Sequence, residues 1–249
     1  MQSLPVRSFV RGSWALALAI IAGLAIAVRA DDIQVVVPGF LESVDAVSGN
    51  KVPFSFPPAR YQQLNLAAEF DEISGPTLIT QVAFRLDKTG AVFTHTILDM
   101  QLNLSTAAVT PLSSGYDTNV GSDDTMVYDG ELTISANSAP GSVRPFEIVI
   151  PLQTPFGYDP SAGDLLLDLR MIDNTDGGVV PFIDSYTVPA TLARVFCQTG
   201  CDPDDSGGSI DGGFLVTRFT FAPEPSSALA GAVAMLALGL VARARACPS

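Results

Sequence analysis

An acidic segment near the end of the chain, Asp202-Pro203-Asp204-Asp205-Ser206-Gly207, has residue types that could bind a cation. Oxygen-bearing side chains stand at its first, third and fifth positions and glycine at its sixth, which is similar to the beginning of a helix–loop–helix calcium loop. The final ligand position of such a loop is Gly213 here, so the complete pattern is not met. Two interpretations stay open, a looser calcium site and an ordinary solvated turn. The residues of the looser site are Asp202, Asp204, Asp205 and Asp211.

Catalytic chemistry has few candidate residues. His95 is the only histidine, so a nucleophile–histidine relay or a histidine-assisted metal site would have to use it. It stands in the segment 93–97, where we interpret it as a structural residue. Carboxylates are abundant, but a glycosidase pair depends on a spatial separation that a sequence does not show. We therefore predict no catalytic residue, no enzyme activity and no cofactor other than the calcium considered above.

Two of the three cysteines, Cys197 and Cys201, stand four residues apart. In an exported chain this spacing favours a local disulfide that closes a loop. Metal binding by the pair is the alternative, but no second Cys/His pair is present to complete a tetrahedral site.

Alternating apolar residues define the elements that must position these side chains. Period-two patterns recur along the chain, and clusters of Gly, Pro, Asp and Ser separate them. This pattern predicts an all-β fold, an antiparallel β-sandwich or jelly roll that forms one domain over residues 31–222. The exceptions are residues 61–70, where the strand pattern breaks and residues 66–70 could form one helical turn, and residues 105–119, which could hold a short helix or a long loop. The predicted strands lie near residues 80–86, 98–104, 146–150, 165–171 and 215–221.

The two ends of the chain differ from the middle. Residues 1–30 combine Arg7 and Arg11 with an apolar run and small residues, which predicts an export signal cleaved after Ala27 or Ala30. The alternative is an uncleaved membrane anchor. At the other end, the uncharged residues 226–242 predict a short transmembrane helix, and the arginines after it favour a cytoplasmic end.

The C-terminal segment 223–249 resembles the PEP-CTERM sorting signal of bacterial exported proteins. The resemblance rests on a Pro-Glu-Pro tripeptide, an Ala/Gly/Leu-rich helix and terminal arginines, namely Pro223, Glu224, Pro225, Arg243 and Arg245. It implies recognition by exosortase, a membrane protease, and delivery to the cell surface or the polysaccharide matrix. The middle of the chain, including Arg60-Tyr61-Gln62-Gln63-Leu64, is similar to a recurrent exported PEP-CTERM domain without assigned activity.

Charge narrows the choice of partners. The chain has 13 basic and 26 acidic residues, a formal net charge of −13, and five of the basic residues lie in the terminal segments. A middle region this acidic repels nucleic acid and anionic lipid, which excludes nucleic-acid recognition.

We expect a non-enzymatic component of the cell surface or extracellular matrix. The alternative is a carbohydrate-binding module, with or without calcium. Its stacking residues would be Tyr61, Tyr116, Tyr128, Tyr158 or Tyr186, because the only tryptophan, Trp14, lies in the signal.

Overall fold

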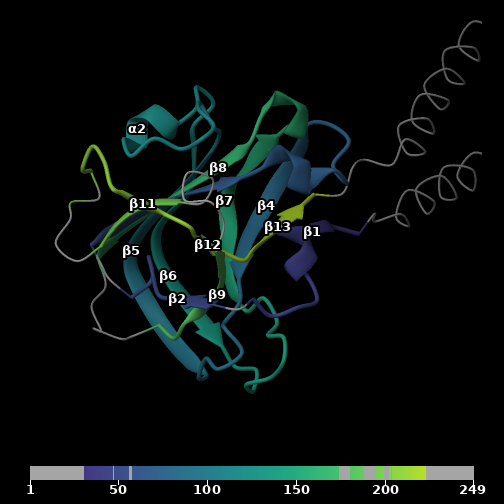
Figure 1. The fold of residues 1–249 in the computed structure, drawn as a ribbon, viewed down its shortest axis with the longest axis vertical. Coiled ribbons are helices and arrows are strands. Elements are labelled where there is room, and N and C mark those ends of the chain that lie inside the picture. The colour runs from purple at the N-terminus through teal and green to yellow at the C-terminus, as the bar shows by residue number, and fades with distance from the viewer. Residues whose placement is uncertain are drawn as a thin grey trace, which may run out of the picture. The chain divides into compact units, whose positions relative to one another are not determined.

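Antiparallel β-strands make up most of the folded chain in the computed structural model, which confirms the predicted all-β class (Figure 1). The structure describes residues 31–46, 48–55, 58–173, 180–187, 194–198, 202 and 204–222. Within these ranges no helix is both long enough and apolar enough to cross a bilayer. The predicted signal over 1–30 and the predicted sorting tail with its helix over 226–242 lie outside the described residues.

Residues 32–222 form one compact unit. Its strands are β1 (Ile33–Val37), β2 (Ser48–Asn50), β3 (Ala59–Asn65), β4 (Thr77–Phe84), β5 (Phe93–Thr106), β6 (Thr125–Ala136), β7 (Ile148–Tyr158), β8 (Leu165–Asp173), β9 (Ile183–Thr187), β10 (Arg194–Gln198), β11 (Ser209–Asp211), β12 (Gly213–Leu215) and β13 (Thr217–Phe221). Its short helices are the 3-10 turns η1 (Gly39–Leu41), η2 (Ala67–Phe70) and η3 (Pro160–Ala162) and the α-helical turn α2 (Tyr116–Asn119). The turns η2 and α2 confirm the two helical turns that the sequence predicts. The predicted break in the strand pattern over 61–70 is wrong for residues 61–65, because they belong to β3.

The described strands form three antiparallel sheets. The order is β1-β13-β4-β7 in the first, β11-β10-β3-β8-β5-β6 in the second and β12-β9-β2 in the third. The main apolar core lies between the first two sheets, because strands of both contribute to one buried cluster. Val82 of β4 and Phe219 of β13 belong to this cluster, as do Tyr61 of β3 and Leu169 of β8. Burying one face of each sheet against the other makes a β-sandwich.

Strand β3 is buried on both of its faces. Successive side chains point to opposite sides of a strand, so Tyr61 enters the main core and Leu64 faces outward. The outward side is covered by the 107–120 segment, whose Leu112 and Tyr116 pack with Leu64 in a second apolar cluster. Polar residues of β3 therefore lie in the interior, where they need internal hydrogen-bond partners.

The structure also differs from the expected strand pattern in places. Strand β7 begins at Ile148, so Phe146 precedes it. Leu215 belongs to β12 in the third sheet, not to β13, since the chain changes sheets at Val216. Ala83 and Arg85 alternate with the apolar Val82, Phe84 and Leu86, a pattern that predicts a wetter face for them, but both are buried. Arg85 is covered because the 41–46 segment lies over its guanidinium, a contact between distant parts of the chain.

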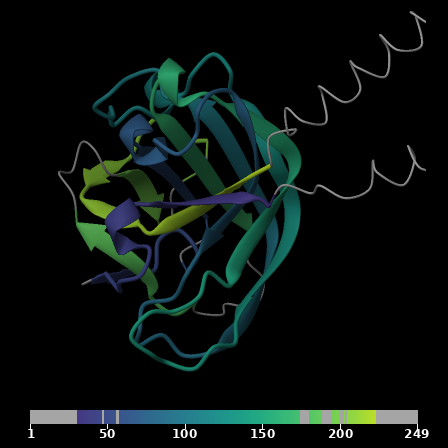
Figure 2. The same ribbon diagram turned by 90° about the vertical axis from the view of Figure 1, so that its right-hand side faces the viewer.

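The first and last strands of the unit are neighbours. Strands β1 and β13 pair along their whole length, from Ile33 opposite Phe221 to Val37 opposite Thr217, and Figure 2 shows them side by side. Antiparallel pairing places the start of β1 beside the end of β13. The chain therefore enters and leaves the folded unit at one place.

Candidate functional site

The acidic loop that the sequence nominates for calcium uses its carboxylates in other ways. Arg194 Nη2 donates a hydrogen bond to Asp211 Oδ2 at 2.8 Å, and Arg170 Nη1 donates to Asp204 Oδ1 at 2.9 Å. The other two carboxylates, Asp202 and Asp205, accept hydrogen bonds from backbone N–H groups in the same turn. Calcium binding by this loop stays a prediction, with half of its proposed ligands engaged by arginine.

The structure describes only some of the remaining candidates from the sequence. Asp123, part of a further acidic pair, accepts hydrogen bonds from the backbone and hydroxyl of Thr106 and so closes a loop. His95 is buried within β5. Cys197 on β10 is disulfide-bonded, and Cys201 lies outside the described residues. The sorting residues Pro223, Glu224, Pro225, Arg243 and Arg245 also lie outside them.

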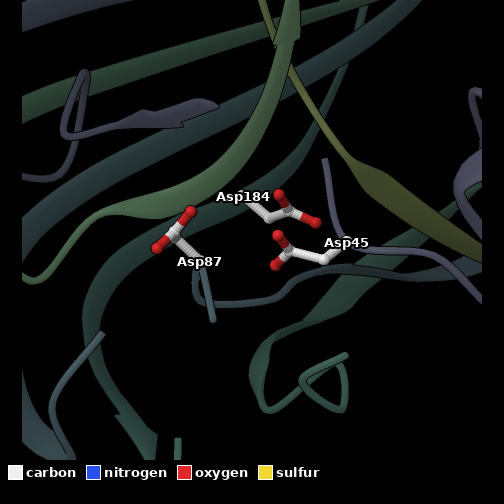
Figure 3. Close-up of side chains that lie close together, drawn as sticks. All are labelled: Asp45, Asp87 and Asp184. Carbon is white, nitrogen blue, oxygen red and sulfur yellow. The ribbon is translucent and has the colours of Figure 1, made fainter. Parts of the chain in front are cut away.

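A different group of carboxylates is brought together by the fold (Figure 3). Oxygen atoms of Asp45, Asp87 and Asp184 all lie within 4.8 Å of one another. Asp184 belongs to β9, Asp87 follows β4, and Asp45 lies between η1 and β2. Asp184 is fully buried, Asp87 is 9% exposed and the Asp45 side chain is 8% exposed. Three like charges in so little solvent repel one another, so the carboxylate cluster requires nearby positive charge.

Arg85 supplies the first positive charge and fixes the backbone around the cluster. Its Nε donates to Asp184 Oδ2 at 2.8 Å, and its Nη2 lies 2.8 Å from the same oxygen. The two Nη groups also donate to the carbonyl oxygens of Leu41, Glu42 and Val44, at 2.6–3.2 Å. The planar guanidinium can serve all these acceptors because its five N–H groups point in fixed directions. Arg85 thus holds the 41–46 segment over the end of β4.

Lys88 supplies the second positive charge from the surface. Its backbone N–H donates to Asp45 Oδ1 at 3.1 Å, and its Nζ lies 3.1 Å from Asp45 Oδ2. Asp45 Oδ2 is a buried atom, and the Lys88 ammonium is the cation beside it. The Lys88 side chain is 54% exposed. The contact between Lys88 and Asp45 is therefore an ion pair that solvent can reach.

The electrostatics of the cluster follow from this arrangement. Burial raises the pKa of Asp184 above its ordinary value, the Arg85 guanidinium and the Ala46 N–H oppose the rise, and the charge of Asp45 adds to it. The neighbouring Asp45 carboxylate raises the pKa of Lys88, and Asp87 and Asp184 contribute in the same direction. The cluster therefore favours positive charge at the position of the Lys88 ammonium.

The carboxylate cluster is the arrangement best suited to hold a metal among the residues that the structure describes. Its donor atoms are oxygens alone, the donor set that calcium and magnesium prefer, and no histidine or thiolate accompanies them. The sequence analysis missed it because Asp45 and Asp184 are 139 positions apart. One signal was available, because the acidic Asp184 directly follows the apolar segment 180–183 and the basic Arg85 directly follows the apolar residues 82–84.

A second buried polar network surrounds the segment Arg60–Asn65. Arg60 donates through Nε and Nη2 to both oxygens of Asp168, at 3.1 and 2.7 Å. Gln62 Nε2 donates to the same carboxylate at 2.9 Å. On the opposite face, Gln63 Oε1 accepts from Tyr61 and from the Leu215 N–H. These side chains are buried and satisfy one another, so the network is structural.

Comparison of the chain with protein-family models, with curated proteins and with solved structures finds no match. The functional argument therefore rests on the geometry and composition of this chain.

Proposed function

We propose that this chain is an exported, non-enzymatic component of the cell surface or extracellular matrix, sorted through its C-terminal PEP-CTERM-like tail. In this proposal residues 31–222 form a jelly-roll-like sandwich between a cleaved signal (1–30) and a sorting tail (223–249). The observation that carries it is the pairing of β1 with β13, the two strands that adjoin those segments.

The position of the chain ends suits a tethered module. Because Ile33 pairs with Phe221, the signal-derived end and the tail attach at the same edge of the folded unit. The six-stranded sheet and the carboxylate cluster then need not face the point of attachment. A tail that is cut or retained at this edge leaves the fold unchanged, since no described strand extends past Phe221.

Topology and charge support the same proposal. The chain passes from β3 in the second sheet to β4 in the first and back to β5 in the second, as crossing connections of a Greek-key or jelly-roll sandwich do. The whole chain has a formal net charge of −13 although five of its basic residues lie in the terminal segments, so the sandwich is strongly acidic and favours association with cations over nucleic acid or anionic lipid.

Fractionation of a bacterium that carries an exosortase tests the sorting proposal. The full-length chain would carry one epitope in an exposed loop of the sandwich and a second at the C-terminus. We expect the loop epitope in the envelope or medium and loss of the C-terminal epitope. Glu224→Gln should block that loss, whereas Glu72→Gln, the same change at an exposed site on the sandwich, should not. Cytoplasmic chains with an intact N-terminus would refute the proposal.

Carbohydrate binding remains a second candidate, favoured by one surface feature. A hollow of about 730 Å³ lies beside Phe196 and is otherwise lined mainly by small polar residues and glycines, a size that suits a small ligand. Against it, four of the five tyrosines considered for stacking are buried: Tyr61, Tyr116, Tyr128 and Tyr158. Binding of a polysaccharide that Phe196→Ala abolishes and Phe182→Ala preserves would favour this candidate. An array without binding, in calcium or in chelator, would remove it.

A further inference from the structure

We propose that Asp45, Asp87 and Asp184 form a calcium site in which the Lys88 ammonium is a built-in counter-ion that calcium displaces. The site lies apart from the acidic 202–211 loop, and it does not depend on the sorting proposal. One oxygen from each of the three carboxylates lies within 4.8 Å of the other two, and Figure 3 shows the three side chains together. At least one oxygen from each carboxylate, completed by water, can contribute to the six to eight oxygen ligands that calcium takes.

Acidic clusters are common, so the proposal rests on a further observation, the state of Asp45. The Asp45 side chain is 8% exposed, and its buried Oδ2 meets no hydrogen-bond donor of the interior. A buried carboxylate oxygen ordinarily has a hydrogen-bond donor, because leaving one unsatisfied is costly. The group beside it is a cation, Lys88 Nζ at 3.1 Å. The fold therefore already places positive charge where a metal ion would bind.

The charges favour an exchange of ammonium for calcium. Arg85 is bound within the interior to Asp184 and three carbonyl oxygens, so it stays in place. The carboxylates and Arg85 together carry a charge of −2, which a divalent ion neutralises and a single ammonium does not. Lys88 can leave at little cost, because its flexible side chain is 54% exposed and an ammonium is well hydrated.

Calcium fits better than the other divalent ions. The donors are carboxylate oxygens without sulfur or imidazole, which disfavours zinc and copper. The carboxylates come from three separate segments, and calcium tolerates such irregular geometry whereas magnesium demands a near-ideal octahedron. The competing lysine lowers the affinity, so we expect a Kd of about 10⁻⁴–10⁻³ M, the range of extracellular calcium modules.

Calcium titration of the full-length chain in detergent solution, by calorimetry and by thermal unfolding, tests the proposal. We expect binding by the unaltered protein and a rise in Tm of about 5–10 °C at a hundredfold excess over Kd. Asp87→Asn should weaken binding at least tenfold, and it keeps an oxygen that can accept from the Thr89 N–H and hydroxyl. Lys88→Gln should tighten binding about fivefold, because it removes the competing charge.

The matched control is Asp204→Asn, which makes the same chemical change at an exposed carboxylate of the acidic loop. It should leave the calcium affinity unchanged. If Asp204→Asn abolishes binding and Asp87→Asn does not, the ion binds the loop and the proposal is wrong. Absence of binding up to ~10 mM calcium, in both the unaltered protein and Lys88→Gln, would also overturn it. If circular dichroism shows that Asp87→Asn does not fold, the tighter calcium binding expected of Lys88→Gln still tests the proposal. Equal affinity of Lys88→Gln and the unaltered protein would then count against the proposal.

Discussion

Replacing Arg85 by methionine tests how the carboxylate cluster is held together. Methionine is unbranched and apolar like the stem of arginine, so it fills much of the same space without the guanidinium. The change leaves Asp184, a fully buried carboxylate, without its cation. It also removes the donors to the carbonyl oxygens of Leu41, Glu42 and Val44. The 41–46 segment should then separate from the end of β4.

The expected loss of stability is about 3–5 kcal/mol. Removing one partner of a buried ion pair costs about this much, because the remaining charge is left in a poorly solvated place. The carbonyl groups of Glu42 and Val44 add little, since both are exposed residues whose carbonyls can turn to water, whereas the buried Leu41 carbonyl loses its donor. The control for Arg85→Met is Arg170→Met, the same substitution at an arginine that pairs with an Asp204 side chain that is 80% exposed. That surface pair should be worth less than about 1 kcal/mol.

Urea unfolding of the full-length chain, followed by circular dichroism, measures both changes. The double variant with Asp184→Asn should recover about 1–3 kcal/mol of the Arg85→Met loss, because the unpaired charge is gone while an acceptor for the Ala46 N–H remains. If Arg85→Met costs no more than Arg170→Met, the buried ion pair does not organise the site. A double variant less stable than Arg85→Met alone would contradict the electrostatic explanation.

Two further predictions concern a close backbone contact and the effect of pH. Gly121→Ala should destabilise the fold by about 2 kcal/mol or more, because a Cβ there would lie 1.8 Å from the Thr106 carbonyl oxygen, and urea unfolding measures this. Burial opposes ionisation of Asp211, but hydrogen bonds from Arg194 and the Gly213 N–H outweigh it and lower the pKa. The stabilisation from Asp211 should be present above its ordinary pKa and disappear as the pH falls through the lowered value.

Each of these predictions has a control. Gly75→Ala should change stability by less than about 0.5 kcal/mol, since no atom lies within 4 Å of a Cβ at that position. If both alanine substitutions change the free energy of unfolding equally, the backbone around Gly121 moves to accommodate the added Cβ and the prediction is wrong. For Asp211, the Asp211→Asn variant should be less stable than the unaltered protein at pH 7, and the difference should narrow in acid. A difference that is constant with pH would mean that the Asp211 charge contributes nothing.

Much of the fold class could be predicted from local patterns. The alternating residues near 98–104 and 165–171 correspond to β5 and β8, and the turn at 67–70 corresponds to η2. Such patterns succeed where one face of a strand packs in a core and the other is wetter. They fail at β3, because its polar residues are buried on both faces and the covering 107–120 segment is distant in sequence.

The sequence by itself determined the all-β class, the acidity of the folded region, the scarcity of catalytic residue types and the sorting-signal resemblance of the tail. These are properties of composition, short-range periodicity and local motifs. Only the tertiary structure decided which carboxylates meet. Asp204 and Asp211 pair with arginines from other strands, while Asp45, Asp87 and Asp184 converge from three segments around Arg85. The physical reason is that charge clusters form through long-range packing, which brings together residues that no local pattern relates.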